Sequence, residues 1–133
     1  MSSILPALSL ILTATLFGGM VLYSFGFAAL VFKLFDQKQA RYALRHAFPP
    51  YYLVVIIAAA VAAVPSAFVD HWLAIILGLT AITTVYARQI LMPKINAATD
   101  AGETGRFKLL HSVSVILQLI QIAAVAYALT LFL

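Results

Sequence analysis

The chain has 133 residues, of which 65% are hydrophobic and only 9% are charged. A composition this apolar excludes a water-soluble globular domain and is typical of a chain that lies largely within a lipid bilayer. The absence of cysteine excludes disulfides, thiolate metal sites and cysteine nucleophiles. The net charge of +4 does not predict nucleic-acid binding, because the basic residues fall in loops that would meet an anionic membrane surface.

The first apolar segment runs from Ile4 to Phe32 without a charged residue. A helix of this length would measure about 43 Å, which exceeds a hydrocarbon core of ~30 Å, so we expect it to tilt or to emerge at one end. Small residues in membrane helices mark places where two backbones approach closely. We therefore predict that Gly18, Gly19 and Gly26 pack against a neighbouring helix.

Charged and apolar residues alternate over residues 33–46. This pattern predicts an extension at the membrane interface that carries the first helix to about residue 45. Pro49 and Pro50 are expected to end the extension and to open the second membrane helix, over residues 50–69.

A third apolar helix is predicted over residues 71–92, ending before Pro93. The polar stretch that follows is expected to be a loop, and the last helix is predicted over residues 105–132. Together these segments predict an all-α fold, a four-helix transmembrane bundle that forms a single domain over residues 1–133.

The basic residues predict the orientation of the chain. All of them lie in the two loops at one side of the bundle or in the helix ends beside those loops: Lys33, Lys38, Arg41, Arg45, Arg88, Lys94, Arg106 and Lys108. Because Lys and Arg concentrate in cytoplasmic loops, both termini are expected on the outer side. The expected location is a cell membrane, as a multi-pass protein, and the inner membrane if the chain is bacterial.

The last helix carries a polar face. Its members, spaced by three, four and three residues, are His111, Ser114, Gln118 and Gln121. Such spacing places them on one side of a helix, and polar groups in lipid are expected to point into the bundle. Two interpretations stay open. The face either bonds to Thr80, Thr83 and Thr84, or it lines a polar cavity open to the cytoplasm near His111, with Arg88 available to an anionic group.

His46 and His111 are both expected near the cytoplasmic boundary. Two histidines at one depth can bind a metal ion or haem iron, or relay protons. Alternatively, both lie at the interface and make hydrogen bonds only. The remaining titratable residues offer no further centre, because the four acidic residues all fall in loops and no nucleotide-binding motif or catalytic triad is present.

Three stretches of this chain resemble a known family. They are Phe17-Gly18-Gly19 followed by Phe25; His46-Ala47-Phe48-Pro49-Pro50-Tyr51-Tyr52; and Met92-Pro93-Lys94-Ile95 followed by Phe107-Lys108-Leu109-Leu110-His111-Ser112-Val113-Ser114. In order and spacing they are similar to the family of transmembrane protein 205, a four-helix membrane domain of largely unknown function. The resemblance marks Phe48, Pro49, Tyr51, Pro93, His111 and Ser114 as motif positions.

These features support more than one functional hypothesis. The first is a non-enzymatic, transport-related or accessory membrane subunit that works as a homo-oligomer or with a partner membrane protein. The alternative is a haem- or metal-binding membrane redox protein that uses His46 and His111. The first helix has no histidine, in contrast to small four-helix proteins of haem and copper biology, and this lowers the haem interpretation. A third, weaker hypothesis is an exporter of lipids or drugs.

Overall fold

The computed structural model describes residues 3–133, which form helices and short connections without any strand. In order they are α1 (Ile4–Val21), η1 (Leu22–Phe27), α2 (Ala28–Leu34), α3 (Gln37–Ser66), α4 (His71–Tyr86), η2 (Ala87–Leu91), α5 (Met92–Asp100) and α6 (Thr104–Thr130). The elements η1 and η2 are single π-helical turns inside longer helices. The chain therefore has four continuous spans, each long and apolar enough to cross a membrane, and the predicted all-α four-helix membrane bundle is confirmed.

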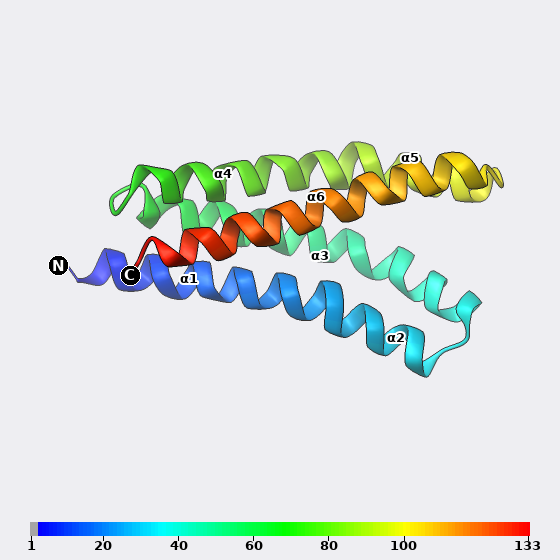
Figure 1. Ribbon diagram of the computed structural model, residues 1–133, viewed down its shortest axis with the longest axis horizontal. Coiled ribbons are helices and arrows are strands. Elements are labelled where there is room, and N and C mark those ends of the chain that lie inside the picture. Colours follow the sequence, from blue (N-terminus) through cyan, green and yellow to red (C-terminus); the bar gives the residue numbers. More distant parts are fainter. Residues whose placement is uncertain (1–2) are drawn as a thin grey trace.

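The spans run alternately up and down, so both termini lie at the same end of the bundle (Figure 1). We call this the terminal end, and we call the other the basic end, because every Lys and Arg lies toward it. The second span, α3, packs against α1 and α4, and α6 packs against the same two helices. Which end faces the cytoplasm stays a prediction from the basic residues.

The first helix ends earlier than predicted. It stops at Leu34, and Phe35 and Asp36 adopt extended backbone, with φ/ψ of −116°/157° and −67°/167°. The Asp36 carboxylate accepts a hydrogen bond of 2.8 Å from the backbone N–H of Gln39 and so caps a new helix. The extension predicted to continue the first helix to residue 45 was therefore wrong, because these residues form the start of α3.

The prolines also lie elsewhere than predicted. Pro49 and Pro50 are inside α3 and do not begin it, since the Asp36 cap starts the helix more than two turns earlier. Membrane helices tolerate such prolines where neighbouring helices supply compensating contacts. Pro93 does not end the third span either, because the wide turn of η2 directly precedes it and places it in the first turn of α5. The third span consequently continues to Asp100, whereas the last helix lies within two residues of its predicted bounds.

Alanines of α3, and not the glycines of the first span, make the close helix contacts. Ala59 and Ala62 are fully buried between neighbouring helices. A Cβ atom built at Gly18 or Gly19 would meet no atom within 4 Å, and one at Gly26 would meet only Leu22 of the same helix, at 3.2 Å. The prediction that these glycines pack against another helix of the chain was wrong. Gly19 instead lines an open groove of about 360 Å³ between α1 and α3.

Candidate functional site

At one level of the bundle, three of the four spans carry a feature that interrupts the regular ladder of backbone hydrogen bonds. The first contains η1, the second contains Pro49 and Pro50, and the third contains η2. Hydrogen bonds show that these irregular segments are neighbours: the Tyr23 hydroxyl donates to the Ala47 carbonyl at 2.9 Å, and Arg88 Nε donates to the Pro49 carbonyl at 3.0 Å. The last span, α6, passes this level with neither a π-turn nor a proline. π-turns of this kind occur frequently at functional sites.

A hydrogen-bonded polar group lies inside this level. Ser24 Oγ and the Tyr51 hydroxyl are 3.1 Å apart. The side-chain amide of Gln118 donates to the Tyr51 hydroxyl at 3.1 Å and also to Ser24 Oγ. The first, second and last spans therefore each contribute one residue to a single hydrogen-bonded network. Ser24 and Gln118 are half-buried, while Tyr51 is buried.

Aromatic rings surround the polar group. The rings of Tyr23 and Tyr51 stack with centroids 4.4 Å apart and planes inclined by 4°. Phe48 presents its edge to both, at 5.7 Å and 5.5 Å, and Tyr52 lies 5.6 Å from Tyr51. Offset and edge-to-face contacts of this kind stabilise beyond the area they bury. We call these six residues the belt cluster: Tyr23, Ser24, Phe48, Tyr51, Tyr52 and Gln118.

The inner part of the polar face of α6 joins helices together. The buried amide of Gln121 donates to Thr83 Oγ1 at 2.7 Å and to Thr84 Oγ1 at 3.1 Å, and it lies 3.5 Å from the Thr80 carbonyl. These contacts match the interpretation in which α6 bonds to the threonines of the third span. Ser114, half-buried, lies beside the Tyr52 hydroxyl.

His111 does not point into the bundle as predicted. Its side chain is exposed, and its ring stacks on Phe107 one turn earlier, with centroids 5.3 Å apart. His111 lies in the first half of α6, whereas the buried residues of this helix, Gln121, Val125 and Ala128, all lie in its second half. His46 is exposed too, with Nδ1 2.9 Å from the Tyr42 carbonyl and its ring against Tyr42. Each histidine contacts its own helix, and a shared metal or haem site stays a prediction.

Because His111 is exposed, its removal should barely affect the fold. We expect His111→Ala to unfold within a degree or two of the parent, since surface substitutions away from special features change stability by less than about 0.5 kcal/mol. Circular dichroism during heating in detergent measures this. A clear drop that His111→Gln restores would instead indicate a buried hydrogen bond. Absorbance of the purified parent and the His46→Ala/His111→Ala double variant tests the haem interpretation, which requires a Soret band that the double variant loses.

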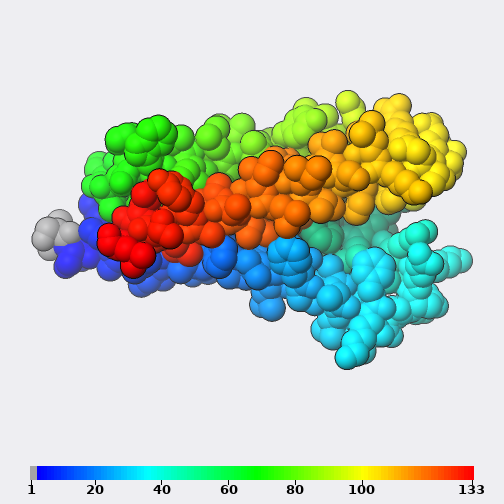
Figure 2. All heavy atoms as spheres, viewed as in Figure 1, coloured from blue at the N-terminus to red at the C-terminus, as the bar shows by residue number. Residues whose placement is uncertain are grey.

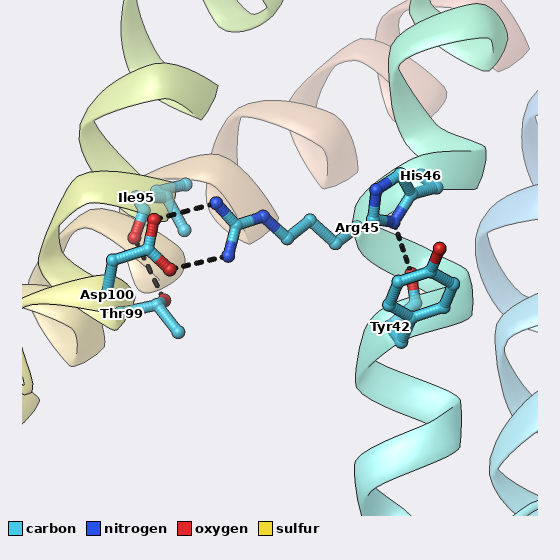
Figure 3. Close-up of polar contacts among 6 residues, drawn as sticks. All are labelled: Tyr42, Arg45, His46, Ile95, Thr99 and Asp100. Carbon is cyan, nitrogen blue, oxygen red and sulfur yellow. Dashed lines mark hydrogen bonds and ion pairs between the residues drawn. The ribbon is translucent and has the colours of Figure 1, made fainter.

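An ion pair joins the two halves of the basic end. Arg45 of α3 reaches across to Asp100 at the end of α5, and its two terminal nitrogens bind the two carboxylate oxygens at 2.7 Å and 2.8 Å (Figure 3). Both side chains remain exposed, at 38% and 60%. Hydrogen bonding to Arg45 lowers the pKa of Asp100 below its usual value of 3.8.

This ion pair predicts a weak pH dependence of stability. A carboxyl with a lowered pKa in the folded state stabilises the fold above its ordinary pKa, and the contribution disappears as the pH falls through the folded value. We expect Asp100→Asn to lower the melting temperature slightly at pH 7, and we expect this difference to shrink as the pH falls below 3.8 and to vanish once the folded carboxyl is protonated. Asp70→Asn is unsuitable as a control because Asp70 caps α4. Glu103→Gln, which removes an equal charge nearby that is not paired with Arg45, is the control for the loss of charge alone.

The surface is hollowed at the basic end. Figure 2 shows a notch between the helices α5 and α6 (yellow to orange) and the segment around the α2–α3 connection (cyan), with the middle of α3 visible behind it. The side chains that the belt cluster offers are neutral hydroxyls, an amide and aromatic rings. Such groups can bind a neutral or weakly polar molecule by hydrogen bonds and stacking. Among residues 3–133, no three His, Asp or Glu side chains gather as metal ligands.

Sequence reasoning identified only part of this cluster. Tyr51, Phe48 and Gln118 were candidates, but Tyr23, Ser24 and Tyr52 were not. The available signal was that Tyr23-Ser24 interrupts the apolar first segment with two hydroxyls, at a depth where polar groups need partners. Pro49 meets Arg88 through its carbonyl, and Pro93 lies beyond the cluster, in α5.

Comparison with known proteins identifies one family. The family model described as a domain of unknown function (DUF4149) matches residues 11–104. This range contains five of the six belt residues and most of the first three spans, and it ends where α6 begins. No curated protein and no solved structure matches the chain.

Proposed function

Because this chain belongs to the family described as a domain of unknown function (DUF4149), we propose its function from its own residues: a non-enzymatic, transport-related or accessory membrane subunit. In this proposal the belt cluster is the functional site, and water and small molecules reach it from the basic end. Its location is a cell membrane, and the inner membrane if the chain is bacterial.

One observation carries the proposal: at the level of a polar cluster, two spans contain a π-helical turn and a third contains a pair of prolines. Irregular backbone at membrane depth is tolerated where it is buried in protein or lines a water-filled cavity. In transporters, interrupted membrane helices form the binding site. The half-buried state of Ser24 and Gln118 fits a site of this kind better than a sealed contact, for which Gln121 is the example within this chain.

The chemistry of the cluster supports a binding role over a catalytic one. The Ser24 hydroxyl bonds to Tyr51 and Gln118, and neither acts as a general base at neutral pH. A single copy with four helices also encloses little space for a pathway. We therefore propose that the subunit works within an assembly, either with copies of itself or with a partner membrane protein.

We also propose that the chain is related to the family of transmembrane protein 205. The stretch His46–Tyr52 resembles the corresponding motif of the transmembrane protein 205 family, and it supplies Phe48, Tyr51 and Tyr52 to the belt cluster. The last part of the third stretch, residues 107–114, lies outside the range matched by the family model. The link to transmembrane protein 205 therefore rests on the resemblance of residues alone.

The proposal is tested by water access to the cluster. The chain has no cysteine, so single cysteines can be placed without background. We expect Ser24→Cys in membranes to react with a membrane-impermeant thiol reagent, and Ala59→Cys, fully buried in the same bundle, to stay unreacted. Ile120→Cys, on the lipid-facing surface, is the second control, because a charged reagent does not reach it. If Ser24→Cys is as inert as Ala59→Cys, the cluster is a sealed packing contact and the proposal fails.

A further inference from the structure

Arg88 carries a positive charge that the protein does not neutralise. Residues 3–133 contain a single ion pair, between Arg45 and Asp100. Asp36 and Asp70 cap helices at other places, and no carboxylate lies within ion-pair distance of Arg88. A half-buried guanidinium without a protein counter-ion favours an anionic partner, because burying a charge that is not paired costs free energy.

The guanidinium is held in one orientation. Nε donates to the Pro49 carbonyl at 3.0 Å, and Nη1 donates to Gln89 Oε1 at 2.9 Å. These two bonds leave one N–H on Nη1 and both on Nη2 without a protein partner among the described residues. The amide nitrogen of Gln89, whose oxygen is already bonded, offers further donors beside them. Fixing donors before binding reduces the entropy lost when a ligand arrives.

The depth and surroundings of Arg88 select an amphipathic ligand. The helix from Asp70 to Arg88 rises about 27 Å, close to the ~30 Å thickness of a hydrocarbon core. The guanidinium therefore lies where the phosphates of the leaflet at the basic end are expected. Val85, Tyr86 and Ile90 beside it are 42–45% exposed, so the donors are flanked by apolar surface.

We propose that Arg88, with Gln89, binds the phosphate of an anionic phospholipid in the leaflet at the basic end. The planar guanidinium pairs its remaining N–H groups with two phosphate oxygens, while the acyl chains lie along Val85 and Ile90. This inference is independent of the belt cluster, which lies on the inner side of the same level. The proposal also gives η2 a role, because this π-turn contains Arg88, which bonds to the Pro49 carbonyl.

Native mass spectrometry of the detergent-solubilised protein tests this proposal. Phosphatidylglycerol is titrated against phosphatidylcholine of the same chains, with Arg88→Gln, Arg88→Lys and Arg41→Gln beside the parent. We expect the parent to prefer phosphatidylglycerol and Arg88→Gln to weaken its binding about tenfold, the loss of one charged hydrogen-bonding partner. Arg41→Gln removes an equal charge from an exposed residue of α3 and should stay within twofold of the parent.

Each other outcome overturns the assignment. Equal weakening in Arg88→Gln and Arg41→Gln would indicate diffuse charge attraction without a site. Displacement of the lipid by glycerol 3-phosphate at the same concentration would make the ligand a soluble phosphate. If Arg88→Gln does not purify folded, Arg88→Lys decides: it keeps the charge but lacks the planar donor pair, so undiminished binding would contradict the proposed geometry.

Discussion

Ala59→Leu is expected to lower the folded yield and the melting temperature strongly, whereas Gly19→Leu is expected to leave both unchanged. Ala59 is fully buried on the crowded side of α3, so a leucine there forces helices apart. Overpacking a tight interior costs about 1–3 kcal/mol or more. A side chain at Gly19 enters the open groove between α1 and α3, where its Cβ atom would meet no other atom within 4 Å.

Ala60→Leu is the matched control for this pair, because Ala60 is the next residue of the same helix and is exposed. Thermal unfolding in one detergent, followed by circular dichroism, compares the three variants. A parallel loss of stability in Ala59→Leu and Ala60→Leu would mean that α3 does not pack as described. A loss confined to Gly19→Leu would restore the glycines as the main helix contact.

Tyr51→Ala is expected to be among the most destabilising single changes in the chain. Tyr51 stacks on Tyr23, meets the edge of Phe48, and bonds to Ser24 and Gln118. Truncating a buried aromatic residue costs about 3–5 kcal/mol. Tyr51→Phe removes only the hydroxyl and should cost about 0.6–2 kcal/mol, the range for interhelical hydrogen bonds in membranes.

The exposed Tyr86 supplies the control for this experiment, since Tyr86→Ala removes an equal volume from the outer surface. Equilibrium unfolding in mixed micelles gives the free-energy differences. If Tyr51→Ala and Tyr86→Ala unfold alike, the belt cluster contributes nothing special to packing. If Tyr51→Phe is as damaging as Tyr51→Ala, the hydroxyl and not the ring holds the cluster together.

The four spans could be predicted from the sequence because hydropathy and the placement of basic residues report directly on membrane crossing. The break at Phe35 and Asp36 could not, since a helix that ends and one that continues share the same alternating pattern there. Nor could η1 and η2, because a π-turn is a local shift of hydrogen bonds without a residue signature. Pro93 therefore suggested a helix end that does not occur.

Only part of the candidate site could be predicted from the sequence. The spacing from Ser114 to Gln121 gave the correct inner face of α6, since helical periodicity is a property of the chain itself. It failed at His111, because periodicity does not tell where a helix leaves its neighbours. Small size likewise made the glycines of the first span candidates for a helix contact, but which side of a helix faces a neighbour is set by the whole bundle.

Sided thiol labelling of Ser24→Cys is the most direct test of the central claim, a belt cluster open to the basic end. Sealed vesicles are prepared inside-out and right-side-out, with a reporter at Leu133 to establish which face carries the termini. We predict reaction with an impermeant reagent only from the face opposite Leu133. Reaction from the face of Leu133, equal reaction from both faces, or no reaction from either would contradict the account.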